Sequence, residues 1–238
     1  MSIEERLESL IKLGKFLSTE STHIDELIRR AEAQNKWFTK DNCTIAIRSI
    51  AEFYLDEPSL RSFAAAYKLD KEIKQRRVGL VLAGNIPLVG FHDILCAYLT
   101  GHVSMIKLSD KDSVLIPFLT DMLCQIDERN TNYFSYIDRL KDFDAVIATG
   151  SDNSAMYFET YFSKYPHIIR KNRHAVAILT GQETEDELMQ VGKDIFRYFG
   201  LGCRSISKIY VPEGYDSNPI MGQLDHFKDI MHLSLIHI

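Results

Sequence analysis

The chain has 238 residues, and 45% of them are hydrophobic, which is enough to form the core of one large or two small globular domains. Its net charge of -5 arises from acidic and basic residues that are interspersed along the sequence, so no basic field exists to hold a nucleic-acid backbone. We therefore expect no nucleic-acid partner.

No apolar run is long enough to span a bilayer, and the first residues, M-S-I-E-E-R-L-E, are charged where a secretory signal would be basic and then apolar. These features predict a cytoplasmic protein without a membrane span. The four cysteines show no C-x-x-C spacing, which predicts reduced thiols and neither a disulfide framework nor a metal site.

The first part of the chain is predicted to be helical. Apolar residues recur at helical spacing over 3–16, and the acidic side chains in the first turns suit the helix dipole. Ser21 or Thr22 can cap a second helix, and Pro58 suits the first turn of a fourth. The third helix is expected from one apolar face, which comprises Ile45, Ile47, Ile50, Phe53 and Tyr54.

From residue 74 onward, short apolar runs alternate with helical patterns. The runs predict strands over 78–83, 103–108, 144–149, 175–180 and 206–211. The helical patterns cover 88–99, 114–126, 152–162 and 185–199. Apolar strands that alternate with helices are typical of a parallel sheet covered on both sides, so the expected fold class is α/β after a helical lead-in.

Cys203 lies in the stretch R-Y-F-G-L-G-C-R-S-I-S-K, where the helical periodicity ends and a strand begins. Gly200 and Gly202 lack a β-carbon, which lets a substrate or other backbone approach the sulfur, and the positive charges of Arg204 and Lys208 favour the reactive thiolate. This setting predicts a nucleophile, although most free cysteines are small buried hydrophobic residues. We assign that structural role to Cys43, Cys96 and Cys124.

Polar residues follow three of the expected strands, at the end of the sheet where ligands bind in open parallel sheets. The amide of Asn85 can donate to an oxyanion, or it can bond its own backbone in a turn. Lys107 can hold a ribose or phosphate, or be solvated. Ser151 opens a helix in a geometry that binds phosphate, or is an ordinary N-cap. No strand is followed by G-x-G-x-x-G, so the usual dinucleotide fingerprint is missing.

Three segments, taken together and in this order, resemble the aldehyde dehydrogenase superfamily and, within it, the LuxC-like acyl-CoA reductases typified by the fatty-acid reductase of bacterial bioluminescence. They read L-A-G-N-I-P-L-V-G-F-H-D-I-L-C-A-Y-L-T-G-H-V-S-M-I-K-L-S, then A-T-G-S, then G-L-G-C-R-S-I-S-K-I-Y-V-P-E-G-Y. The segment N-K-W-F-T at 35–39 is also similar, and the resemblance extends from about residue 30 to about residue 225.

The resemblance implies an oxidoreductase that uses NADPH to reduce a long-chain fatty acyl thioester to the aldehyde through an acyl-enzyme on Cys203, with Asn85 stabilising the oxyanion. It further implies a nucleotide site that comprises Lys107, Ser109, Thr149, Gly150 and Ser151, with the lysine on the adenosine ribose. The substrate is expected to be a fatty acyl-CoA or an acyl-protein, with an acyltransferase or acyl-protein ligase as a partner. The full-length protein is expected to form homo-oligomers.

One departure from the superfamily concerns the reaction direction. Hydrolytic aldehyde dehydrogenases carry an E-L-G-G-K segment whose glutamate activates water, whereas residues 169–175 read I-R-K-N-R-H-A without a carboxylate. Loss of this base favours acyl-CoA reduction, because the thioester must be protected from water. Aldehyde oxidation and a non-catalytic scaffold remain the alternatives. His92 and His174 are candidate proton donors, with packing or surface roles as the alternative.

The domain organisation follows from these patterns. We expect a helical region over 1–73, a dinucleotide-binding α/β domain over 74–180, the beginning of a catalytic domain over 181–230 and a non-native tail over 231–238. Members of the resembling family continue well past this point, so the chain is expected to be a C-terminally truncated reductase.

Overall fold

A computed structural model describes residues 1–19, 21–69 and 73–230 of the chain. Their contacts divide the chain into two compact units, 1–171 and 172–238, which are described separately below. The domain boundaries expected from the sequence stay a prediction, and the expected non-native tail, 231–238, lies outside the described residues.

The first unit begins with four helices whose N-termini are capped by side chains. They are α1 (Ile3–Leu17), α2 (Thr22–Gln34), α3 (Lys40–Ser49) and α4 (Glu57–Ala66). Ser2 and Glu5 form a capping box at α1, Ser21 caps α2, and Pro58 lies in the first turn of α4. The helical lead-in is therefore confirmed.

A π-helical turn, η1 (Ile50–Tyr54), continues α3 and changes which side chains face the core. Ile47 and Ile50 are buried, as expected, but Ile45, Phe53 and Tyr54 are exposed. The single apolar face predicted over 45–54 was therefore wrong. The wider hydrogen-bonded turn, in which the Leu55 N–H donates to the Ile50 carbonyl, shifts the residues after it out of the 3.6-residue repeat.

A five-stranded parallel sheet follows in the first unit. Its strands are β1 (Arg77–Val81), β2 (Val103–Lys107), β3 (Phe134–Tyr136), β4 (Ala145–Thr149) and β5 (His167–Arg170), in the spatial order β3-β2-β1-β4-β5. The α/β fold class is confirmed, but β3 and β5 were not predicted. From β1 the chain passes to β2 and then to β3 on one side, and it then crosses to β4 and β5 on the other side of β1. The direction of the strand order therefore reverses next to β1.

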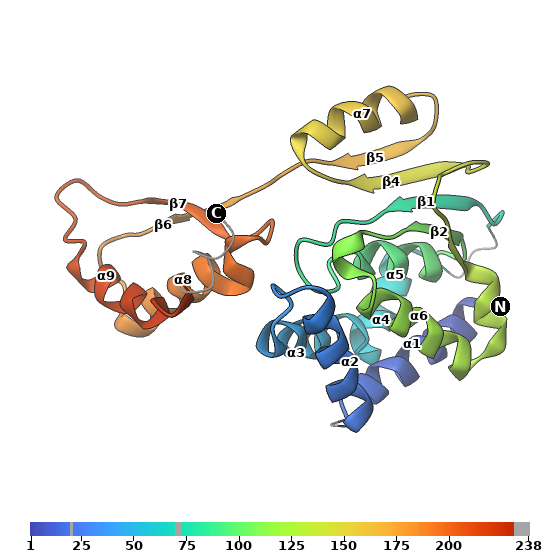
Figure 1. The fold of residues 1–238 in the computed structure, drawn as a ribbon, viewed down its shortest axis with the longest axis horizontal. Coiled ribbons are helices and arrows are strands. Elements are labelled where there is room, and N and C mark those ends of the chain that lie inside the picture. Colours follow the sequence, from blue (N-terminus) through green and yellow to red (C-terminus); the bar gives the residue numbers. More distant parts are fainter. Residues whose placement is uncertain (20, 70–72, 231–238) are drawn as a thin grey trace. The chain divides into compact units, whose positions relative to one another are not determined.

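Three helices connect these strands: α5 (Phe91–Leu99), α6 (Leu115–Ile126) and α7 (Asp152–Phe162). In Figure 1, α5 and α6 lie with the helical lead-in, whereas α7 lies apart from them beside β4 and β5. The short 3-10 turns η2 (Asp110–Asp112) and η3 (Glu128–Tyr133) flank α6. Helix α5 begins at Phe91 instead of residue 88, because Leu88 adopts a left-handed backbone conformation with φ 59°.

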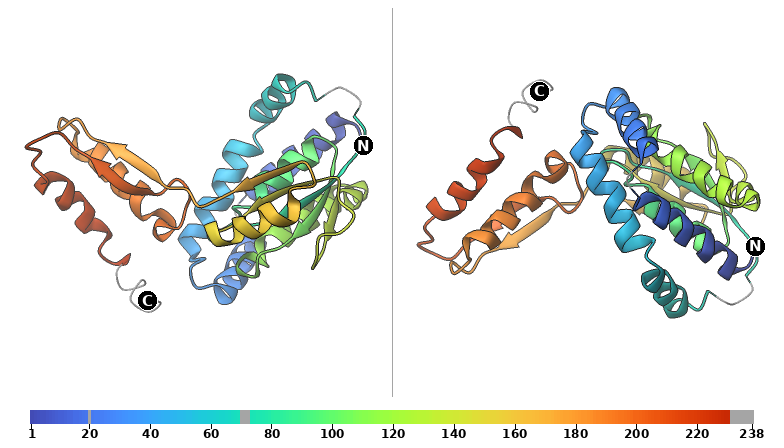
Figure 2. Two further views of the ribbon diagram at one scale, coloured as in Figure 1. Left: turned by 90° about the horizontal axis from the view of Figure 1, so that it is seen from above. Right: turned by 90° about the horizontal axis from the view of Figure 1, so that it is seen from below.

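The second unit contains two parallel strands, β6 (Ala175–Ile178) and β7 (Ile206–Tyr210), which form a sheet of their own. Helix α8 (Glu185–Phe196) packs against β7, and α9 (Asn218–Leu224) packs against α8, on one side of the two strands (Figure 2). Leu179, Leu188 and Ile220 form the small core of this unit. The helix expected over 185–199 ends at Phe196, and a 3-10 turn, η4 (Arg197–Gly200), follows.

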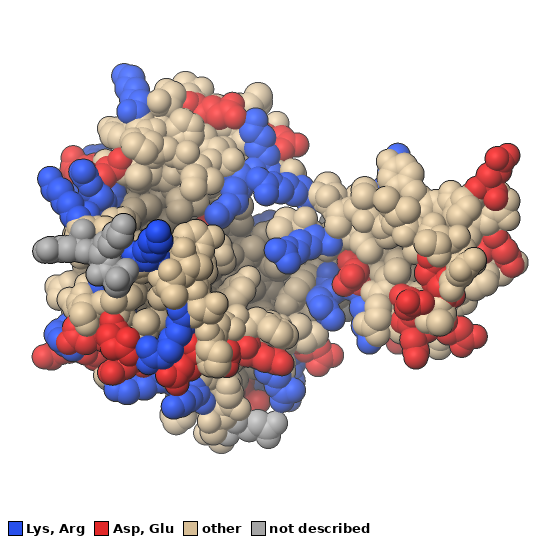
Figure 3. Space-filling model, turned by 180° about the vertical axis from the view of Figure 1, so that it is seen from behind, with Lys and Arg blue, Asp and Glu red and all other residues tan. Residues whose placement is uncertain are grey.

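The surface of the first unit carries both signs of charge. On the face drawn in Figure 3, basic and acidic side chains are interspersed over this unit. Among the helices in the described part of the chain, none has the length and apolar character required to cross a bilayer.

Candidate active site

The carboxyl ends of β1, β2 and β4 lie in register at one edge of the first unit's sheet. Val81 of β1 is paired with Lys107 of β2 on one side and with Ala148 of β4 on the other. The turns that follow these strands therefore start side by side. The reversal of strand order between β1 and β4 makes this edge the expected ligand site of an open α/β sheet.

The turn after β1 carries Asn85, whose side chain is half-buried. The flanking Gly84 is required by close approach to the next turn, since a β-carbon there would lie 2.5 Å from Ser109 Oγ. Lys107 and Ser109, at the end of β2, are both half-exposed. The structure thus brings Asn85, Lys107 and Ser109 to adjoining turns of the same edge.

Thr149, Gly150 and Ser151 lie at the junction of β4 and α7. Ser151 is the N-cap of α7, and its Oγ accepts a hydrogen bond of 3.3 Å from the Ser154 N–H. Gly150 lies close to the first turn of the helix, where a β-carbon would be 2.9 Å from Ser154 Cβ. Ser151 therefore has an ordinary capping role, and the other N–H groups of the first turn of α7 lie at the same edge.

Cys203 lies in the second unit, in the turn between η4 and β7, and its side chain is exposed. The backbone enters this turn through three residues with positive φ, Tyr198, Phe199 and Gly200. The Ser205 N–H then donates to the Gly202 carbonyl at 3.0 Å and closes the turn. The position of the thiol between helix and strand agrees with the sequence pattern, and its exposure leaves it accessible to an electrophile.

The other three thiols have different surroundings. Cys43 is fully buried, and burial raises the pKa of its thiol to about 12. Cys96 and Cys124 are only half-buried, so the expectation of buried hydrophobic residues was right for Cys43 and incomplete for the other two. Burial raises the pKa of Cys124 as well.

Sequence analysis missed a buried ion pair that fixes α5 to the edge strand β5. Arg170 Nη1 lies 2.5 Å from Asp93 Oδ1, and Asp93 is 4% exposed. Burial alone would raise the pKa of Asp93, but hydrogen bonds from His92 and Arg170 lower it below its usual range. Two basic residues of the segment 169–175 therefore form ion pairs: Arg170 with Asp93, and Lys171 with Glu159 at 2.8 Å.

His92 lies beside this pair, with its Nδ1 3.6 Å from Asp93 Oδ1 and its Nε2 3.7 Å from Cys96 Sγ. The neighbouring Asp93 carboxylate, followed by Cys96, raises the pKa of His92 to about 10. We expect the His92 ring to remain protonated at pH 8, and Asp93→Asn to move its titration toward the ordinary value near 6.5. Titration of the ring carbon protons by NMR checks this; a neutral His92 at pH 8 in the unmodified chain would contradict it.

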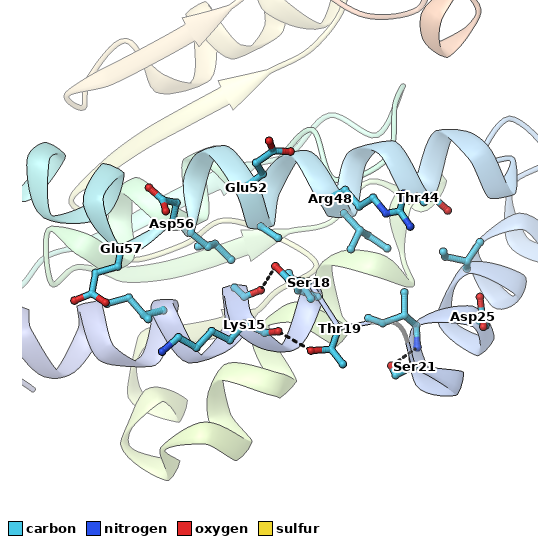
Figure 4. A pocket seen from close by; sticks show the side chains of 18 of the residues that line it. Lys15, Ser18, Thr19, Ser21, Asp25, Thr44, Arg48, Glu52, Asp56 and Glu57 are labelled. Atoms are coloured by element: carbon cyan, nitrogen blue, oxygen red, sulfur yellow. Dashed lines mark hydrogen bonds between the residues drawn. The ribbon is translucent and has the colours of Figure 1, made fainter.

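A large concavity lies elsewhere, in the helical lead-in. It is a groove of about 970 Å³ between α1, α2 and the α3–η1 helix (Figure 4). None of the predicted site residues lines it. Its hydroxyl groups serve the backbone, since Ser18 and Thr19 donate to the carbonyls of Gly14 and Lys15 at 2.9 Å and 3.0 Å. Charged side chains of both signs, among them Lys15, Arg48 and Glu52, also line the groove, and we assign no function to it.

Comparison with known proteins identifies the family. The acyl-CoA reductase (LuxC) family matches residues 17–221, a range that contains every candidate site residue. The chain belongs to the LuxC family of acyl-CoA reductases. A search of curated proteins found no match.

Solved structures share the fold of this LuxC-family chain. An NAD-dependent aldehyde dehydrogenase from Sinorhizobium meliloti superposes with a TM-score of 0.73 at 16% identity, covering 96% of this chain and 49% of that one. A glyceraldehyde-3-phosphate dehydrogenase from Methanocaldococcus jannaschii, solved with NADP, gives 0.71 at 15% identity, covering 96% and 54%. An aldehyde dehydrogenase from Bacillus cereus, solved with NAD+, gives 0.69 at 16%, covering 95% and 50%.

These similarities establish an aldehyde-dehydrogenase-like fold. The LuxC-family chain spans about half the length of the solved chains that it matches. Cys203 and the other candidate residues lie in different units, so their joining in one site is a proposal. Within the described ranges, no group of three or more His, Cys, Asp or Glu side chains is arranged to hold a metal ion.

Proposed function

We propose that this chain carries the acylation and cofactor-binding residues of an NADPH-dependent reductase that converts a long-chain fatty acyl thioester to the aldehyde. The observation that carries the proposal is the exposed thiol of Cys203, in a turn that follows three residues with positive φ and lies inside the region that matches the acyl-CoA reductase family. A nucleophile must be accessible to the acyl donor, and the other cysteines in the described residues are more buried.

In the proposed reaction, the Cys203 thiolate attacks the thioester carbonyl, a new C–S bond forms, and the thiolate of the donor leaves. The Asn85 amide donates to the oxygen on which negative charge develops. The segment 169–175 supplies no carboxylate to activate water, and two of its basic side chains are paired with acids of the first unit. No carboxylate of that segment can therefore activate water to hydrolyse the acyl group on Cys203.

The residues at the sheet edge suit a dinucleotide. Lys107 supplies a cation, Ser109 a hydroxyl, and the start of α7 at Thr149, Gly150 and Ser151 supplies backbone amides. An ammonium group and helix N-terminal amides are the donors expected for ribose and phosphate oxygens. When bound, NADPH supplies the hydride that reduces the acyl group. Structural relatives solved with NADP and with NAD+ support a nicotinamide dinucleotide on this fold.

Lys107→Ala is expected to weaken NADPH binding by about tenfold, because a charge-assisted contact to the nucleotide is lost. Fluorescence titration with NADPH measures this, and titration with NADH determines whether the adenosine phosphate is recognised. Lys164→Ala, which removes an exposed lysine between α7 and β5, is the matched control. Equal affinity of the Lys107 and Lys164 variants would contradict the assignment of Lys107.

Product analysis tests the direction of the reaction. We expect a long-chain acyl-CoA with NADPH to give the fatty aldehyde, and the aldehyde with NADP+ to give no free acid. Formation of free acid from the aldehyde would favour an oxidative aldehyde dehydrogenase. An acyl-protein in place of acyl-CoA tests the second donor class, and transfer from an acyltransferase or acyl-protein ligase would be the corresponding partner interaction.

A further inference from the structure

The turns after β1 and β2 pack closely against each other at the carboxyl ends of these strands. A β-carbon at Gly84 would lie 2.5 Å from Ser109 Oγ, 2.7 Å from Ser109 Cβ and 3.2 Å from the Asp112 backbone nitrogen. The first turn, residues 82–90, therefore lies directly on the second, residues 108–114. The Asp112 N–H donates to the Ser109 carbonyl at 3.1 Å, and this hydrogen bond closes the second turn.

A buried carboxylate holds the far end of the first turn. Asp112 is 3% exposed, and its Oδ2 accepts a hydrogen bond of 2.8 Å from the Leu88 N–H. Leu88 has φ 59°, a backbone conformation that is unfavourable for a residue with a β-carbon. Such a conformation persists when its surroundings hold it, and here the bond to Asp112 and the burial of the Leu88 side chain do so.

Asn85 lies between these two fixed points, Gly84 and Leu88. On this basis we propose that Asp112 is a positioning residue that holds the Asn85 turn in the conformation required to stabilise the oxyanion during acylation of Cys203. The inference rests on the proposed function. Asp112 acts through the backbone of the turn and does not touch the substrate.

The electrostatics of Asp112 agree with a specific role. Burial raises the pKa of its carboxyl group to about 6, although the amides of Leu88, Leu115 and Ile116 oppose this effect. A carboxylate is costly to bury, and here its strongest opposing amide is that of the strained Leu88. The competing explanation is that Asp112 serves only the start of α6 through Leu115 and Ile116.

Amide hydrogen exchange of the full 238-residue chain separates these explanations at the level of structure. In Asp112→Ala, exchange of the Leu88 amide is expected to rise about tenfold or more, because its acceptor is gone. Asp112→Asn retains an oxygen acceptor and is expected to restore most of the protection. Asp110→Ala, an exposed acid in the same turn, is the control and should leave the exchange of residues 84–90 unchanged.

The rate of Cys203 acylation at saturating long-chain acyl-CoA tests the catalytic consequence. Asp112→Ala is expected to lower this rate about tenfold or more, without a change in the acyl-CoA concentration that gives half the maximal rate, and Asp112→Asn to restore most of it. In an Asn85→Ala background the same change should cost less than about twofold, because the group that Asp112 positions is already absent. A role confined to α6 predicts the same fold loss in both backgrounds.

Equal losses in both backgrounds, or an unchanged Leu88 exchange rate in Asp112→Ala, would overturn the inference. If the unmodified chain acquires no acyl group on Cys203, the proposed function is contradicted together with the catalytic part of this inference. The exchange comparison then still decides whether Asp112 orders the turn, since it requires no substrate.

Discussion

Cys203→Ala is expected to abolish the release of CoA from a long-chain acyl-CoA. The unmodified chain should release about one equivalent of CoA per chain in the first turnover, as the thiolate becomes acylated. Without the sulfur no acyl-enzyme can form, so the rate of this burst should fall by roughly 10³-fold or more. A thiol-reactive chromophore in stopped flow measures the released CoA.

Cys96→Ala and Cys124→Ala are the matched controls, because both remove a half-buried thiol from the first unit. Each should retain the full burst. A burst that survives in Cys203→Ala but is lost in one of these two variants would move the nucleophile to the first unit and contradict the proposed site.

Asn85→Ala is expected to slow acylation of Cys203 by roughly 10²–10³-fold, the usual effect of removing one oxyanion donor. The concentration of acyl-CoA that gives half the maximal rate should change little, because the amide acts where charge develops in the transition state. Rapid quench followed by mass spectrometry of the acylated chain measures the rate.

Asn132→Ala is the control for this variant, since Asn132 is exposed and its amide donates to the nearby Arg129 carbonyl at 3.2 Å. Thermal unfolding should show that both variants keep the fold. An Asn85→Ala chain that is acylated at the original rate would leave Asn85 with the role of an ordinary turn residue.

Helix caps and apolar runs predict those helices and strands whose conformation depends on their own residues. Ser21 and Pro58 mark the starts of α2 and α4, and the apolar runs mark β1, β2 and β4. The short strands β3 and β5 were missed, because their three and four residues are largely exposed and gain their place by pairing with β2 and β4.

The candidate site shows the same limit. Turns after strands identify Asn85, Lys107 and Ser151 from the sequence, since the carboxyl ends of parallel strands share one edge. Asp112 and the Arg170–Asp93 pair carry no local signal, because each acts on a residue more than 20 positions away in the sequence. Only tertiary structure brings such partners together.

The central claim is that a thioester is reduced through an acyl group on Cys203, and sequential mass spectrometry tests it most directly. Long-chain acyl-CoA is added first, and peptide mapping should place the acyl mass on Cys203. NADPH is added next, and the account predicts that this mass disappears while the fatty aldehyde is released. An acyl group that never forms on Cys203, or one that leaves only as the free acid, would contradict the account.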